Sequence, residues 1–220
     1  MSHELLKRYT LLFCSLFVNA FGVVFITKAA LGTSPISGVP YVLSLASPLS
    51  FGVTTFLLNL IFILIEVSLM GWREVREKRF ELLVQFPILI VFSSSIDLSM
   101  WLLRDFIPET YPEMLASLVF GCAVLATGIG WAVKACVAMN PGEYVVRVMA
   151  TKFGKPFGNV KLCFDSTLVV LAALLSLLFM GGIHGLREGT FVAALLVGPM
   201  ERVSYPLWRI FDYWLQPVRQ

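Results

Sequence analysis

Residues 9–31 decide the fold: they read YTLLFCSLFVNAFGVVFITKAAL and carry one charge, Lys28, near their end. A helix needs roughly 20 consecutive apolar residues to cross the hydrocarbon core of a bilayer. Comparable stretches follow at 51–71, 80–103, 114–137, 157–180 and 190–208. The sequence therefore predicts an all-α, polytopic membrane protein with about six transmembrane helices.

The amino-acid composition agrees with that of an integral membrane protein. Of 220 residues, 58% are hydrophobic and 14% are charged, which leaves too little polar surface to cover a water-soluble globule. The lipid bilayer is thus the expected environment. The net charge of +3 could suit an acidic partner, but the basic residues flank the spans, where orientation explains them. We therefore predict that the chain does not bind nucleic acid.

The basic residues are divided unevenly between the two ends of the predicted spans. With a cytoplasmic N-terminus, the outer side receives only Arg104 and Arg187. The cytoplasmic side receives Lys7, Arg8, Arg73, Arg76, Lys78, Arg79, Arg147, Lys152, Lys155, Arg209 and Arg219. Because cytoplasmic loops carry an excess of Lys and Arg, both termini are expected in the cytoplasm.

The two halves of the chain share residues at a constant separation. Pairs that lie 106 positions apart are Lys28-Ala29 with Lys134-Ala135, Pro35 with Pro141, Phe51-Gly52 with Phe157-Gly158, and Asn59 with Asp165. The third span continues the register at a separation of 107, with Trp101/Trp208 and Asp105/Asp212. The spacing predicts two three-helix repeats, residues 1–107 and 108–220. An odd number of spans per repeat makes the second repeat inverted, an arrangement that suits alternating access.

A short, non-spanning segment follows the first span and another follows the fourth, at 32–47 and 138–156. Thr33 or Ser34 can cap a helix that has Pro35 at its first position, and Asn140 can do the same before Pro141. We predict two short broken or re-entrant helices here. The alternative is that both segments are connectors lying on the membrane surface.

The starts of these short helices are the predicted substrate site. Free amide groups and a partial positive charge at a helix start favour an anionic or strongly hydrogen-bonding group. The predicted substrate-binding residues are Lys28, Thr33, Ser34, Pro35, Lys134, Asn140, Pro141 and Glu143. For the two lysines the alternative is snorkelling, with each ammonium at the membrane interface.

Other polar residues lie within the spans, where a charge near the bilayer centre costs about 3 kcal/mol. The predicted coupling or gating residues are Asn59, Asp97, Asp165, Glu201 and Arg202. The alternative is that they form buried pairs that only fix helix packing. Glu66 is expected at the membrane interface, and Gly198-Pro199 is expected to kink or break the last span.

No catalytic or metal-binding set stands out. The chain has only two histidines, His3 and His184, and its four cysteines form no C-x-x-C pair. A nucleophile, a base and an orienting group at recognisable spacing are missing. The sequence therefore predicts no enzyme activity, no metal and no cofactor.

Three motifs carry a resemblance to a known family: Ile26-Thr-Lys28-Ala-Ala-Leu31-Gly32-Thr-Ser-Pro35, Leu49-Ser-Phe-Gly52 and Gly198-Pro199. On these the chain resembles the YitT/YczE-type family of bacterial membrane proteins over nearly its whole length. It departs from the family pattern at Ser37, where Asp is common, and at Met139-Asn140-Pro141, which replaces the usual Gly-x-Pro, with Glu143 near the expected acidic position. The resemblance implies a multi-pass protein of the bacterial cytoplasmic (inner) membrane and names no substrate.

Two functions remain open on the sequence alone. The first is a membrane transporter, or more narrowly an exporter, of a small polar or anionic metabolite by alternating access at the repeat interface. The alternative is a non-transporting membrane protein that binds or regulates a cytoplasmic partner through the basic segments 73–79 and 147–155. The sequence also allows a homodimer.

Overall fold

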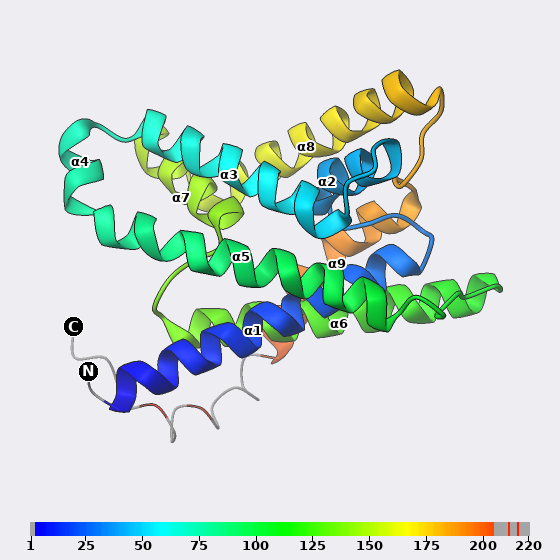
Figure 1. Cartoon of the computed structure of the whole chain (residues 1–220), viewed down its shortest axis with the longest axis horizontal. Coiled ribbons are helices and arrows are strands. Elements are labelled where there is room, and N and C mark those ends of the chain that lie inside the picture. The colour runs from blue at the N-terminus through cyan, green and yellow to red at the C-terminus, as the bar shows by residue number, and fades with distance from the viewer. Residues whose placement is uncertain (1–2, 205–210, 212–214, 216–220) are drawn as a thin grey trace.

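The computed structural model describes residues 3–204 together with residues 211 and 215, and these described residues are helical with short connections and no strand (Figure 1). In chain order the helices are α1 (His3–Lys28), α2 (Pro35–Ala46), α3 (Phe51–Leu69), α4 (Trp72–Glu77), α5 (Arg79–Leu102), α6 (Tyr111–Ala135), α7 (Pro141–Phe153), α8 (Phe157–Met180) and α9 (Glu188–Ser204).

Five of these helices are long and apolar enough to cross a membrane: α1, α3, α5, α6 and α8. They coincide with the first five predicted spans, which confirms a polytopic all-α architecture. Of the sixth predicted span, residues 190–204 lie in α9, which continues as a helix through Pro199 without a break. Residues 205–208 lie outside the described part of the chain, as do Trp208 and Asp212, so the sixth span stays a prediction.

The helices form two layers. One core joins α1, α5, α6 and α9, and the other joins α2, α3, α7 and α8. The layers meet where α3 packs on α5 and α2 on α9. Within the second layer, α2 packs on both α3 and α8, and α7 packs on the same two helices from the other end of the bundle (Figure 1). Each short helix is thus held by long helices from both halves of the chain.

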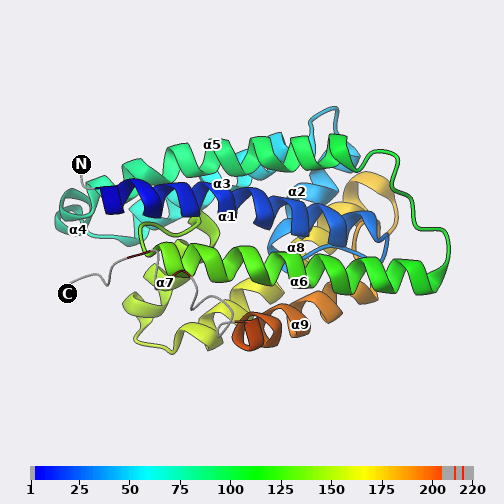
Figure 2. The same cartoon turned by 90° about the horizontal axis from the view of Figure 1, so that it is seen from below.

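The centre of the first layer is the antiparallel pair α1 and α6, which lie side by side along their length (Figure 2). Small residues allow the close approach: Gly22 packs against the backbone of Leu125, and Gly128 packs against that of Asn19. A Cβ atom added at Gly22 would lie 2.5 Å from the Leu125 amide nitrogen. Backbone contact of this kind is typical of helix pairs in membranes, where small residues bring the helix axes together.

Both short helices begin where the sequence predicts, with Pro35 and Pro141 in the first turn and Ser34 and Asn140 at the N-cap position. Neither N-cap side chain bonds to the helix backbone, however. The Ser34 hydroxyl instead donates to the Oγ of Ser37, 2.9 Å away. The expected capping bonds are therefore absent from both helix starts.

Candidate functional site

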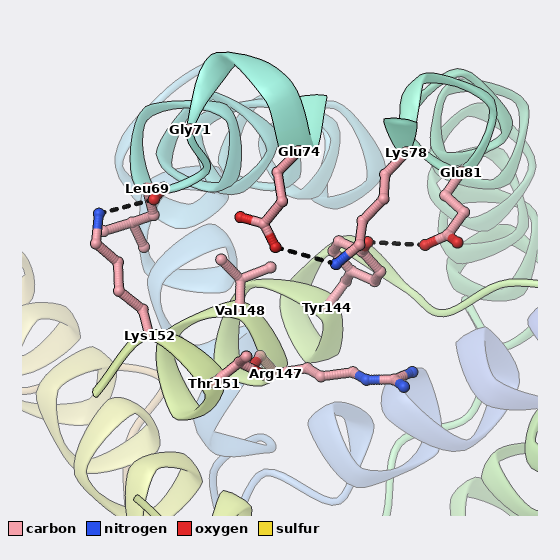
Figure 3. A pocket seen from close by; sticks show the side chains of 10 residues that line it. All are labelled: Leu69, Gly71, Glu74, Lys78, Glu81, Tyr144, Arg147, Val148, Thr151 and Lys152. Atoms are coloured by element: carbon pink, nitrogen blue, oxygen red, sulfur yellow. Dashed lines mark hydrogen bonds and ion pairs between the residues drawn. The ribbon is translucent and has the colours of Figure 1, made fainter. Parts of the chain in front are cut away.

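A polar cavity lies between α7 and the hairpin formed by α3, α4 and α5; we call it the hairpin pocket. Its volume is about 430 Å³, within the size range of small-molecule sites. It is lined by Leu69, Gly71, Glu74, Lys78, Glu81, Tyr144, Arg147, Val148, Thr151 and Lys152 (Figure 3). Segments that are distant in sequence, 69–81 and 144–152, therefore build one polar site.

Most charged groups in the hairpin pocket already have a partner. The Lys78 ammonium lies 3.4 Å from the Glu74 carboxylate, and the Lys152 ammonium donates to the carbonyl oxygen of Leu69 at 2.7 Å. Arg147 differs, because its guanidinium extends away from these pairs (Figure 3). Among the described residues it forms no ion pair, and its hydrogen-bond partner is the sulfur of Met139, 3.7 Å away. Arg147 is thus the cation available to a ligand.

Tyr144 links α7 to α5 inside the hairpin pocket. Its hydroxyl donates to a carboxylate oxygen of Glu81 at 2.8 Å. Burial, followed by the hydrogen bond to Glu81, raises the pKa of Tyr144 well above its ordinary value. The hydroxyl therefore keeps its proton at any physiological pH and acts as a donor that holds the two helices together.

A smaller cavity, the far pocket, lies at the opposite end of the helices from the α4 hairpin. Its volume is about 170 Å³, and it is lined by Thr27, Ala30, Gly32, Tyr41, Gly185 and Arg187. These residues come from the end of α1, from α2 and from the connection between α8 and α9. The Arg187 guanidinium donates to the Ala30 carbonyl at 3.1 Å across this pocket.

The predicted substrate residues of the first half are mostly covered. Thr33 is fully buried; its amide donates to the Thr190 hydroxyl at 3.3 Å, and its hydroxyl lies 2.8 Å from that of Thr27. Ser34 and Pro35 are buried beside it. Lys28 is half-buried and its ammonium donates to the Arg104 carbonyl at 3.4 Å, in the connection after α5.

The predicted substrate residues of the second half lie around the start of α7. Lys134 is half-buried in the last turn of α6, and Pro141 is buried. A side-chain oxygen of Asn140 is buried without a hydrogen-bond partner. The two helix starts meet here, because Ile36 of α2 fills the space beside Gly142 of α7. The structure thus brings the two starts together, with an apolar side chain between them.

Of the predicted coupling residues, the structure gathers those of the second half. Glu143 interacts electrostatically with Lys161 and Asp165 of α8, and Glu201 of α9 interacts with Glu143. The Lys161 ammonium lies 3.3 Å from the Asp165 carboxylate, whose other oxygen is buried without a partner. Burial raises the pKa of Glu143, with Lys161 opposing this shift.

Arg202 interacts electrostatically with Glu201, whereas the coupling residues of the first half, Asn59 and Asp97, lie apart from that group. The Asn59 amide donates to the carbonyl of Thr55 in its own helix at 2.9 Å. Asp97 receives the Gly52 amide and the Ser50 hydroxyl, both at 2.7 Å, and therefore caps the start of α3. Arg202 is exposed on α9.

One buried polar pair was missed by sequence reasoning. Glu66, expected at the membrane interface, is fully buried between helices. Its carboxylate receives a hydrogen bond of 2.9 Å from the amide of Gln85, which is 1% exposed. The sequence did contain one signal for this pair: Glu66 and Gln85 are polar residues inside neighbouring predicted spans. Hydropathy alone does not show that they face each other across α3 and α5.

No group of three or more His, Cys, Asp or Glu side chains among the described residues could hold a metal ion. The polar chemistry found is that of ion pairs and hydrogen bonds at the two pockets and around the start of α7. These features can bind a polar or charged ligand.

The apolar helices and the polar cavities between them define the class: the chain is a multi-pass, all-helical membrane protein. The chain belongs to a family of unknown function (DUF6198), whose model matches residues 6–205. No curated protein and no solved structure matches the chain.

Proposed function

We propose that the protein is a membrane transporter, or more narrowly an exporter, of a small polar or anionic metabolite. It would work by alternating access between two inverted three-helix repeats, 1–107 and 108–220. The observation that carries this proposal is the relation between the pockets. Each lies between the short helix of one half and the connection between long helices of the other half. Tyr41 in the far pocket and Arg147 in the hairpin pocket are 106 positions apart, the separation of the sequence repeat.

The packing contacts support inverted repeats independently of the pockets. Gly22 contacts Leu125, while Gly128 contacts Asn19. Adding 106 to Gly22 and Asn19 gives Gly128 and Leu125, so the two contacts exchange under the repeat. Such reciprocity is what a two-fold axis produces at an interface. Ile36 and Gly142, also 106 apart, contact each other, as residues next to such an axis do.

The two pockets suit a rocking mechanism. In transporters with inverted repeats, one half moves against the other around a central site and opens it to each side in turn. Under this proposal the larger hairpin pocket is the open entrance in the present conformation, and the far pocket is its closed counterpart. The contact between Ile36 and Gly142 is then the barrier that must open to let the substrate pass.

The charges of the hairpin pocket support a polar, anionic substrate. The Arg147 guanidinium offers a planar set of donors that suits carboxylate or phosphate. Lys78 and Lys152 lie in the same pocket, and the Glu74 carboxylate that pairs with Lys78 is exposed. An anionic ligand can therefore compete for Lys78 as it binds Arg147.

The orientation follows from the distribution of basic residues. We propose the bacterial cytoplasmic membrane, as the resemblance to the YitT/YczE-type family implies, with α9 as a sixth span and both termini in the cytoplasm. The N-terminus of α1 and the hairpin around α4 lie at the same end of the bundle (Figure 1), so the hairpin pocket then opens to the cytoplasm.

Cysteine accessibility tests this function. In a background without Cys14, Cys122, Cys136 and Cys163, single cysteines replace Thr151 in the hairpin pocket, Arg187 in the far pocket and Ser34 at the buried start of α2. Membrane-impermeant maleimides are then applied from each side. We expect T151C to react from the cytoplasm and R187C from outside. S34C should react more slowly, because Ser34 is 6% exposed here.

Labelling of S34C is the decisive result, since it requires a conformation in which the covered site opens. Ser94→Cys is the matched control: Ser94 is exposed on α5, faces lipid under this proposal and should stay unlabelled. If T151C reacts but S34C never does, the pockets are surface hollows and alternating access is refuted. In that case Arg147→Gln should also leave the uptake of organic anions by proteoliposomes unchanged.

One observation favours partner binding as the second candidate. The cytoplasmic-end hairpin exposes Trp72 to 81% and Phe80 to 69%, beside the basic residues of α4. A membrane-interface anchor explains the same side chains. Neutralising Arg73 and Arg76 distinguishes the two: loss of a bound protein without a change in topology supports partner binding.

A further inference from the structure

The pair formed by Glu66 and Gln85 is short of hydrogen-bond donors. Glu66 is 0% exposed and Gln85 is 1% exposed. One hydrogen bond joins them, from the Gln85 amide to one carboxylate oxygen at 2.9 Å. The other carboxylate oxygen of Glu66 and the amide oxygen of Gln85 are both buried without a partner. Two acceptors at one contact therefore lack a hydrogen.

A single proton resolves this shortage. A protonated carboxyl donates one hydrogen bond and still accepts another, whereas an ionised carboxylate only accepts. On Glu66 the proton supplies the donor that the side-chain oxygen of Gln85 lacks, while the existing bond from Gln85 remains. Burial without a balancing cation also disfavours the charged form. No basic side chain among the described residues forms an ion pair with Glu66.

In the described part of the chain, three helices pack on α3: α5, α7 and α2. The titratable side chain of α2, Tyr41, lines the far pocket at the other end of the helices, so the groups near this pair come from α5 and α7. On α5, Glu81 lies one turn before Gln85. On α7, Tyr144 donates its hydroxyl to Glu81 and also interacts electrostatically with Glu66 and with Arg147. Tyr144 is therefore the side chain that links Glu66 to the charged lining of the hairpin pocket.

We propose that Glu66 is a proton-binding site and that its proton is the coupling ion of the transport proposed above, on which the coupling role rests. The carboxyl keeps its proton while α7 covers it. When the two halves move against each other, the packing around α3 changes and water reaches Glu66. The O–H bond of the carboxyl then breaks, the electron pair stays on the carboxylate, and the proton passes to water. Binding of the proton favours the present conformation, so that conformation gains population as the pH falls.

Infrared spectroscopy of the purified full-length protein tests the proton site without any transport assay. At neutral pH the wild type should show a carbonyl band of a protonated carboxyl that Glu66→Gln removes. Glu77→Gln, at an exposed position of α4, should leave the band unchanged. The amide of E66Q can both donate to and accept from Gln85, so this variant should fold. In Gln85→Leu the band should persist at a shifted frequency. If E66Q and the wild type have equal spectra in the region of the protonated-carboxyl carbonyl band, the proposal is overturned.

Coupling is tested by the maleimide reaction of T151C at several pH values. A one-proton equilibrium changes the population ratio by at most tenfold for each pH unit. We expect a pH-dependent labelling rate, corrected for reagent reactivity with an exposed control cysteine, that becomes constant in E66Q. The same pH dependence in E66Q would refute the coupling role. If S34C never reacts but the carboxyl band is present, alternating access fails while the proton site stands.

Discussion

Replacing Gly22 with alanine is expected to push α1 away from α6. The added Cβ would lie 2.5 Å from the amide nitrogen and 2.7 Å from the Cα of Leu125, whereas non-bonded carbon atoms prefer about 3.5–4.0 Å. Both neighbouring atoms belong to the backbone, so no side-chain rotation relieves the overlap. The two helices must therefore separate by about 1 Å, and a gap of that size forfeits roughly a quarter to a half of each dispersion contact.

The expected change in unfolding free energy of G22A combines two contributions. Overpacking of a close contact costs about 1–3 kcal/mol, and the better helix propensity of alanine returns up to about 1 kcal/mol. The difference is about 0–2 kcal/mol, and the overlap with rigid backbone atoms places G22A in its upper part. We therefore expect a loss of about 1–2 kcal/mol of unfolding free energy, measured by denaturant titration in detergent micelles. Gly158→Ala is the matched control, because nothing lies within 4 Å of its added Cβ, and it should stay within about 0.5 kcal/mol of wild type.

The double variant makes the test sharper. Gly128→Ala meets the backbone nitrogen of Asn19 at 2.7 Å, about one helical turn from the Gly22 contact. Sites this close rarely act independently. Once the first alanine has separated the helices, the second has less to displace, so the double variant should cost less than the sum of the single variants. Wild-type stability of G22A, or strict additivity, would refute the close approach of α1 and α6.

Three further outcomes are expected. Asp97→Ala removes the carboxylate that caps the start of α3 and should lower unfolding free energy by about 1–2 kcal/mol, whereas Asp105→Ala, at an 88% exposed side chain, should not. Tyr144→Phe deletes the bond to Glu81 and should cost about 1 kcal/mol; an unchanged stability would mean that this bond adds nothing. Lys28→Ala should weaken substrate binding or flux in proteoliposomes, and wild-type flux would assign Lys28 to interfacial snorkelling.

Hydropathy and helix-start chemistry predicted most of the architecture. An apolar stretch long enough to span a bilayer has few alternatives to a helix, because lipid cannot satisfy exposed backbone groups. The five confirmed spans follow from this constraint. The starts at Pro35 and Pro141 were predictable for a local reason, since proline fits the first helical turn, where its missing amide hydrogen costs nothing.

The polar contacts depend on which faces of the helices meet, and no local pattern shows this. Position along the chain placed Glu66 near the end of a span, but the rotation of α3 turns its carboxyl towards Gln85. Asp97 was expected in a coupling network, yet its register on α5 sets it against the start of α3. Thr33 was expected to bind substrate, but the start of α9 covers it. Each of these three contacts is set by tertiary packing and not by local sequence.

The proposed repeats differ in charge at three corresponding positions. Ser37, Thr55 and Asn59 of the first half correspond, at the 106-residue separation, to Glu143, Lys161 and Asp165 of the second. Neutral residues suffice at these three positions of the first half. Because a charge at membrane depth costs about 3 kcal/mol, packing alone gives no reason for three charges at the equivalent places. We therefore expect Glu143, Lys161 and Asp165 to take part in the charge-dependent steps of the transport cycle, together with the proton on Glu66 of the first half.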